Sequence, residues 1–133
     1  MNSTPADAQK APKESGSRIL VIEDDPGVLD VIDYLFSELG LVGEIFDDTA
    51  EALEHADAAP GFAAVLFDLD VCRTGHSEFV RKLARHGPVV ALAGAGPGAN
   101  VSLGALAVVV KPFGIKALSL AIEKALGWAG TRR

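Results

Sequence analysis

Short apolar runs alternate with longer stretches of helical periodicity along most of the chain. The run at 19–22 has no polar position, which is typical of a strand buried on both faces of a parallel sheet. The residues after it repeat their apolar side chains every three or four positions, as an amphipathic helix does. This alternation predicts strands at 19–22, 41–46, 63–67, 88–92 and 106–110, and helices at 26–39, 49–58, 76–86 and 115–127.

Capping residues support the first predicted helix. Asp25 is a good N-cap, Pro26 is tolerated at the first helical position, and Gly40 suits the residue after the last turn. The segment 93–105 differs, because four glycines and one proline disfavour a regular helix there. We therefore predict that the fourth helix, between the last two strands, is short or degenerate.

The sequence divides into one domain and two tails. Residues 1–17 are polar and have no hydrophobic period, and we expect them to be a disordered tail. The domain is predicted to span 18–128, with a C-terminal tail at 129–133. Strands that alternate with helices imply an α/β fold, a doubly wound five-stranded parallel sheet with helices on both faces.

Composition and charge exclude several classes of protein. Hydrophobic residues make up 49% of the 133 residues, which supports a core and argues against disorder throughout. The single cysteine, Cys72, excludes an intrachain disulfide and a multi-cysteine zinc site, and it fits a reducing, cytoplasmic setting. The net charge of −6 disfavours nucleic acid as a partner. No apolar run reaches the roughly 20 residues of a membrane span.

Charged residues follow three of the predicted strands. Glu23 and Asp24 come after the first strand, Asp68 and Asp70 after the third, and Lys111 after the fifth. In a doubly wound sheet the site lies outside the carboxyl ends of the strands, so these side chains are expected to meet at one edge. Each acid taken alone is common in an ordinary turn. Charged residues at the ends of three strands at once are much less expected by chance.

Such a group of charges indicates phosphoryl chemistry. Carboxylates brought together repel one another, and a hard divalent cation such as Mg2+ offsets that repulsion through its oxygen ligands. A carboxylate beside a metal and an ammonium group can act as a nucleophile, while the metal and the lysine neutralise the phosphoryl oxygens.

Three segments give this pattern more detail. Residues 19–25 are an apolar strand followed by acids, 64–68 are an apolar strand ending in Asp, and 109–113 end in Lys-Pro-Phe. In their order and spacing they resemble the receiver domains of response regulators in two-component signalling, over about residues 18–127. The resemblance implies a flavodoxin-like receiver fold and a cis peptide bond before Pro112.

The resemblance also implies a role for each site residue. Asp68 would be the phosphoacceptor, and Lys111 would contact the phosphoryl group. Mg2+ would be held by Glu23, Asp24 and Asp68 and by the backbone carbonyl of Asp70, with Asp24 a more direct ligand than Glu23.

The implied partners are proteins. In the family, a histidine kinase or a histidine phosphotransfer protein donates the phosphoryl group from phosphohistidine. The chain's own His55, His76 and His86 are not needed for that step, and we interpret them as solvent-facing. About six residues follow the last predicted helix. We therefore expect a stand-alone receiver, monomer or homodimer, that signals to an unknown downstream protein and turns over no separate substrate.

The pattern departs from the family at the switch positions. The fourth strand of a receiver usually ends in Ser or Thr, where this chain has Ala93. The fifth strand usually carries an aromatic residue where this chain has Val108. The usual coupling of hydroxyl and aromatic side chain therefore cannot operate here in its ordinary form.

Two alternatives follow from these departures and from a local similarity. The chain could be a degenerate pseudo-receiver, an interaction module that works without phosphorylation. The order Asp68-Leu69-Asp70 is also similar to the first motif of haloacid-dehalogenase-type phosphatases, but that motif continues with Gly-Thr and leaves Glu23 unexplained. Retained phosphorylation is favoured over both, because the nucleophile, the acids and the lysine are all present.

Overall fold

Five parallel strands form one sheet in the order β2-β1-β3-β4-β5. The structure is a computed structural model that describes residues 16–94 and 104–131. The strands are β1 Ser17–Ile22, β2 Leu41–Phe46, β3 Phe62–Asp68, β4 Val89–Ala93 and β5 Ala107–Val110. The helices are α2 Pro26–Leu39, α3 Thr49–Ala58, α4 His76–Leu83 and α5 Ile115–Thr131, and a 3-10 turn, η1, covers Leu69–Val71.

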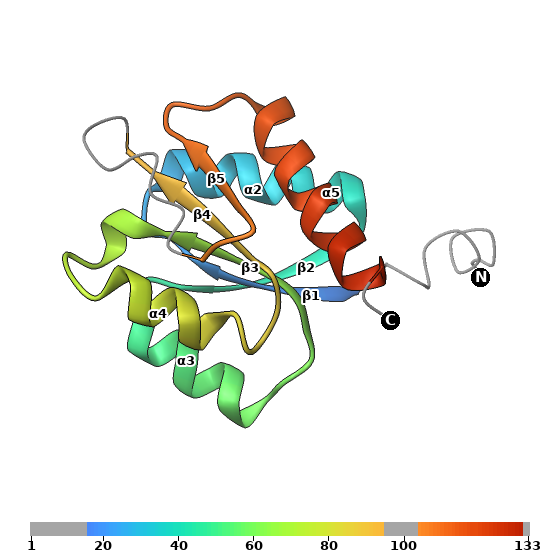
Figure 1. The fold of residues 1–133 in the computed structure, drawn as a ribbon. Helices are drawn as coiled ribbons and strands as arrows, with labels where there is room; N and C mark the ends of the chain where they lie inside the picture. The colour runs from blue at the N-terminus through green and yellow to red at the C-terminus, as the bar shows by residue number, and fades with distance from the viewer. Residues whose placement is uncertain (1–15, 95–103, 132–133) are drawn as a thin grey trace.

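The helices form a layer on each face of the sheet (Figure 1). Helices α2 and α5 cover one face, and their apolar residues pack on a core that includes Ile19, Val21 and Leu66. Helices α3 and α4 cover the other face, over a core that includes Leu20, Ile22 and Phe67. Successive residues of a central strand thus enter opposite cores, which explains why these strands are apolar throughout. The predicted doubly wound sheet is confirmed.

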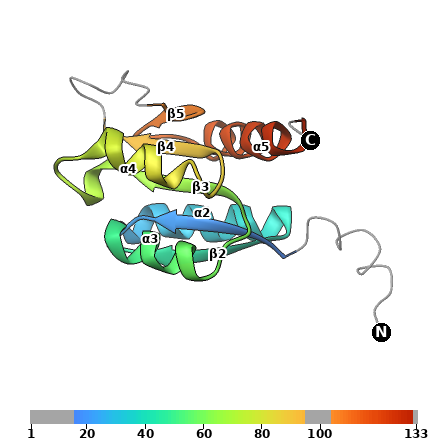
Figure 2. The ribbon, with the colours of Figure 1, turned by 60° about the horizontal axis from the view of Figure 1, so that its bottom comes forward.

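Figure 2 shows the sheet from its side, with the strands following one another from β5 to β2. The strand order places β1 and β3 in the middle, and each of them pairs with neighbours on both sides. Both of these strands end in or just before an acid. The fold therefore carries its predicted acidic residues at the ends of two neighbouring interior strands.

Most helices and strands begin and end close to the predicted residues, with a few differences. The Asp25 side chain accepts from the backbone N–H of Gly27 at 2.8 Å, and Gly40 closes α2 in a left-handed conformation with φ of 71°. Helix α4 ends three residues before its prediction, and α5 continues four residues beyond it. Most of the predicted N-terminal tail and of the segment 93–105 lies outside the described residues. No helix within the described residues is long and apolar enough to cross a membrane.

The expectation of solvent-facing histidines is wrong, since each ring is partly buried and bonded. His55 Nε2 lies 2.6 Å from Glu44 Oε1, within a cluster in which Arg18 also binds Glu44. His76 Nε2 lies 2.9 Å from the carbonyl oxygen of Cys72. His86, whose side chain is 13% exposed, lies 2.9 Å from Asp57 Oδ1. These rings tie helices and loops to their neighbours, a role that the sequence pattern did not reveal.

Candidate functional site

The carboxyl ends of the strands point to the same edge of the sheet (Figure 1). Asp68 is the last residue of β3 and is 1% exposed. Lys111 follows β5, and its Nζ donates to Asp68 Oδ2 at 2.7 Å. The backbone N–H of Lys111 donates to the carbonyl oxygen of Ala93 at 2.7 Å. This hydrogen bond continues the pairing of β4 with β5 and positions the backbone of Lys111. The structure thus brings together two residues that are 43 positions apart.

Glu23 and Asp24 complete an acidic cluster around Asp68. One carboxylate oxygen from each of the three residues lies within 4.8 Å of the others. Glu23 is buried, and its Oε1 accepts from the backbone N–H groups of Asp24 and Asp25 at 3.0 and 3.1 Å. Its Oε2 lies 3.6 Å from Lys111 Nζ and has no hydrogen-bond partner among the described residues. Asp24 is exposed and therefore accessible from solvent.

The proximity of these groups shifts their protonation. Burial, together with the neighbouring Asp68 carboxyl, raises the pKa of Glu23 to about 7. Burial also opposes ionisation of Asp68, but Glu23, Lys111 and the backbone N–H of Asp70 outweigh it and hold the pKa of Asp68 below its ordinary value. Burial disfavours the charged ammonium of Lys111, yet the surrounding carboxylates raise its pKa. Near pH 7, Asp68 is therefore the ionised carboxylate and Lys111 its counter-charge.

The residues of the cluster fit a hard divalent cation. Oxygen atoms of carboxylates and carbonyls are the ligands that Mg2+ prefers, and a buried oxygen without a partner is stabilised by a cation. Glu23 Oε1 already accepts hydrogen bonds from two backbone N–H groups, whereas Asp24 is exposed to solvent. That Asp24 would be the more direct ligand stays a prediction.

A 3-10 turn that the sequence pattern does not predict follows Asp68. Asp68 Oδ1 accepts from the backbone N–H of Asp70 at 2.9 Å, which opens the 3-10 turn η1. The turn carries the Asp70 carboxylate back toward the site, where its Oδ2 lies 4.0 Å from Lys111 Nζ. The strand order predicted that the Asp70 side chain lies at this edge, and the resemblance implied a role only for its backbone carbonyl. Its acidic side chain was visible in the sequence, but its direction depends on the unforeseen 3-10 turn.

Ala93 and Val108, the positions at which the sequence departs from the receiver pattern, lie at the end of β4 and within β5. Ala93 ends β4, is 4% exposed, and presents no hydroxyl beside the cluster. Val108 lies in β5 opposite Ala91 and packs, half-buried, against the core beneath α3 and α4. The Lys111-Pro112 peptide bond is cis, as the resemblance implies. This edge of the sheet therefore carries a lysine from the end of β5 but no hydroxyl from the end of β4.

Comparisons with known proteins agree on the fold. The sequence matches no protein-family model, and no curated protein is similar enough in sequence to count as a relative. A response regulator receiver domain protein from Clostridium thermocellum has a TM-score of 0.74 at 24% identity, over 88% of this chain and 99% of its own. A CheY-like receiver domain protein from Methanospirillum hungatei JF-1 also has 0.74 at 24% identity, over 90% of this chain and 100% of its own.

A third solved structure adds a metal. The receiver domain of a sensor histidine kinase from Pseudomonas aeruginosa PAO1 has a TM-score of 0.67 at 21% identity, over 84% of this chain and 98% of its own. That protein holds a magnesium ion in its active-site cleft. Together these likenesses establish that the chain has the fold of response-regulator receiver domains.

Proposed function

We propose that this chain is a response-regulator receiver that accepts a phosphoryl group on Asp68. One observation carries the proposal: Glu23, Asp24 and Asp68 offer oxygens within 4.8 Å of one another, and Lys111 Nζ lies 2.7 Å from Asp68 Oδ2. A buried carboxylate between cation-binding oxygens and a fixed ammonium group has what phosphoryl transfer requires.

In the proposed reaction an oxygen of Asp68 attacks the phosphorus atom of a phosphohistidine. The new P–O bond forms as the P–N bond breaks, and the histidine nitrogen leaves with the bonding electron pair. The lowered pKa of Asp68 keeps the nucleophile ionised. Lys111 neutralises charge that develops on the phosphoryl oxygens. Glu23, Asp24, Asp68 and the backbone carbonyl of Asp70 would hold Mg2+, which would supply further charge neutralisation.

The proposed donor is a histidine kinase or a histidine phosphotransfer protein. An apolar hollow of about 420 Å³ lies beside Lys111 and is lined by Val28, Val31, Pro112 and Phe113. A donor helix packed there would bring its phosphohistidine to the carboxyl ends of β1 and β3. The proposed output is contact with a downstream protein, and no separate substrate is turned over.

A second candidate function rests on Ala93. Because β4 offers no hydroxyl for the acyl phosphate, a degenerate receiver that works through constitutive contacts is the alternative. The chemistry itself does not need that hydroxyl, since the nucleophile and its counter-charge remain. We therefore place phosphorylation first.

The deciding experiment is phosphorylation by a small donor. The protein is incubated with Mg2+ and acetyl phosphate, and its intact mass is recorded beside that of an Asp68→Asn variant. We expect an adduct of one phosphoryl group that is absent from the variant. Because rapid hydrolysis would hide an adduct, a negative result is repeated with beryllofluoride, a stable stand-in for the acyl phosphate. Failure of both supports the degenerate receiver.

A further inference from the structure

Acidic residues are concentrated in one part of the chain. Residues 23–57 contain 12 of its 18 acidic residues and no Lys or Arg, and they form α2, β2 and most of α3. Most of these acids are exposed, and nine of them have no ion pair with a described residue. This acidic segment, residues 23–57, includes the edge strand β2, whereas α4 carries Arg81 and Lys82.

A hollow lies in this acidic segment, at the carboxyl end of β2. It measures about 370 Å³ and has an apolar part formed by Leu29, Ile45 and Phe46. Ile45 is 49% exposed, although it is a large apolar side chain on an edge strand. The acidic part of the lining comes from Asp47 and Glu51 and, toward the phosphoacceptor site, from Glu23 and Asp24.

We infer that this hollow is a docking site for a Lys or Arg side chain of a partner protein. Such side chains have an apolar stem and a charged head, and they lie along apolar surface while the head stays near water or a carboxylate. The stem would pack on Leu29, Ile45 and Phe46, and the head would reach Asp47 and Glu51. Strand β2 is at the edge of the sheet formed by the described strands, and a partner backbone could lie beside it.

The combination of apolar and acidic residues in the hollow favours a basic side chain of another protein over other occupants. A bare cation gains nothing from the apolar surface, whereas the stem of a basic side chain buries it. A second copy of this chain has a net charge of −6, so two copies repel each other overall. A different protein with a basic surface is attracted by the same charge. The proposed partner would sit beside Asp68, whether or not Asp68 accepts a phosphoryl group.

The test uses a labelled peptide of repeating Leu-Arg-Ala units as the probe, with fluorescence anisotropy as the readout. A rim variant, Asp47→Asn with Glu51→Gln, removes two charges from the hollow. A control variant, Asp30→Asn with Glu38→Gln, removes two exposed charges from α2 that do not line it. A third variant, Ile45→Thr, removes apolar surface only. Urea unfolding confirms that all three remain folded.

We expect the rim variant to weaken peptide binding about tenfold and the control variant less than twofold. Ile45→Thr should weaken binding about threefold, and a Gly-Arg-Ser peptide of equal charge should bind less tightly than the probe. Equal losses in rim and control variants would mean general attraction to an acidic surface and would overturn the inference. A concentration-dependent dimer in sedimentation, abolished in the rim variant, would assign the hollow to a second copy instead. Neither result depends on phosphorylation of Asp68.

Discussion

If Asp68 accepts a phosphoryl group, the side chain at position 93 should affect the rate of that reaction. Ala93 ends β4 beside the acidic cluster, and it is buried. We expect Ala93→Thr to raise the rate of phosphorylation by acetyl phosphate about tenfold, since one well-placed donor stabilises developing oxyanion charge by at least that factor. Intact-mass time courses measure the rate.

The matched control is Ala93→Val, which has the shape of threonine without the hydroxyl. It should phosphorylate no faster than the natural protein. If Val and Thr act alike, the effect comes from packing at the end of β4, and the hydroxyl position has lost its function in this chain.

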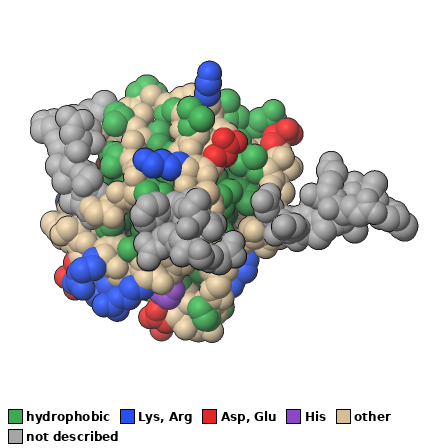
Figure 3. Space-filling view, turned by 45° about the vertical axis from the view of Figure 1, so that its right-hand side comes forward, with side chains coloured by type: hydrophobic (Ala, Val, Ile, Leu, Met, Phe, Trp, Pro, Cys, Tyr) green, Lys and Arg blue, Asp and Glu red, His purple; other side chains and the backbone are tan. Residues whose placement is uncertain are grey.

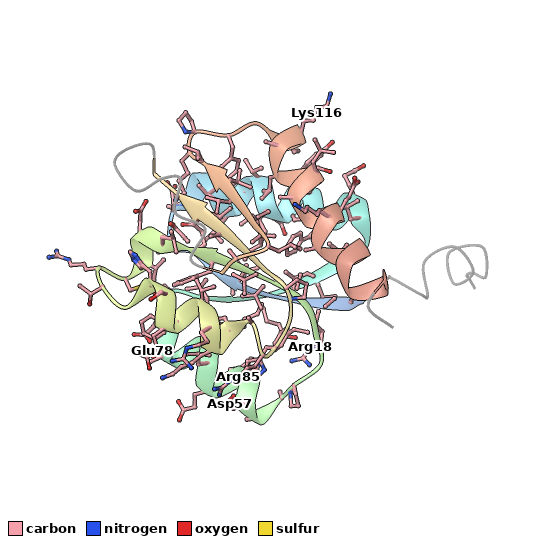
Figure 4. The ribbon with its side chains drawn as sticks, in the orientation of Figure 1. Arg18, Asp57, Glu78, Arg85 and Lys116 are labelled. Carbon is pink, nitrogen blue, oxygen red and sulfur yellow. The ribbon has the colours of Figure 1, made fainter. Side chains whose placement is uncertain are left out.

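Lys111 compensates two buried carboxylates at once. Its Nζ lies 2.7 Å from Asp68 and 3.6 Å from Glu23. Without added metal at pH 8, above the pKa of about 7 for Glu23, we expect Lys111→Met to lower the free energy of unfolding by about 2 kcal/mol. Urea titration measures it. Lys116→Met, on the outside of α5 (Figure 4), should change stability by less than about 0.5 kcal/mol, and an equal loss there would contradict this account.

Which site residues the sequence could reveal depends on how each is positioned. Asp68 and Lys111 lie at strand ends, so the order of the strands alone predicts that they meet. The Asp70 carboxylate needs the 3-10 turn, and that turn is set by one side chain to backbone bond. The burial of His86 depends on contacts between α3 and the loop after α4. Such contacts leave no periodic signal in the sequence.

Strands β1 and β2 and helix α3 are joined by the cluster of Arg18, Glu44 and His55. Arg18 projects from the start of β1 (Figure 4), and its Nε lies 2.7 Å from Glu44 Oε2. Arg18, followed by His55, lowers the pKa of Glu44 from 4.5 to about 2, although partial burial acts the other way. The folded state therefore holds Glu44 ionised in a range of pH where the unfolded chain binds a proton.

This shift predicts an acid-dependent loss of stability. The stabilisation is complete above pH 4.5 and is lost as the pH falls toward 2. Because solvent screens the cluster, we expect about 1 kcal/mol between these limits. Urea unfolding of the natural protein and of Glu44→Gln should differ near pH 6 and converge near pH 2. A Glu54→Gln variant removes an exposed acid of α3. Its difference in stability from the natural protein should not change between pH 6 and pH 2.

The ends of helices were harder to predict than their existence. Helix α4 stops at Leu83 because Gly87-Pro88 follows within one turn, and a residue before proline is pushed out of the helical region. Residues Arg85 and His86 instead bond to carbonyls three positions earlier. Helix α5 runs through Gly127, which is tolerated inside a helix. Apolar periodicity marks the buried middle of a helix and says little about its ends.

For the molecule as a whole, the fold was predictable because both faces of the sheet are buried. Two separate cores leave runs of apolar residues that only a covered parallel sheet explains. The net charge of −6 does not reveal the charge distribution, because it averages an acidic segment at 23–57 with a basic remainder. Figure 3 shows the side that carries α5, where hydrophobic side chains lie among scattered Lys, Arg, Asp and Glu.

Because many acidic residues lie outside the proposed metal site, a test of metal binding needs a control for general attraction of cations. If the cluster of Glu23, Asp24 and Asp68 holds Mg2+, the ion stabilises the folded state, by about 2.7 kcal/mol at a concentration 100 times its Kd. We expect urea unfolding to show this rise, and Asp24→Asn to remove most of it. Asp30→Asn, an equal change of charge on α2, should keep it. A divalent ion also screens an acidic surface, so Na+ at matched ionic strength is compared in parallel. Equal Mg2+-dependent rises in the free energy of unfolding of both variants would assign the effect to screening of the acidic segment. The proposed site would then not hold the metal.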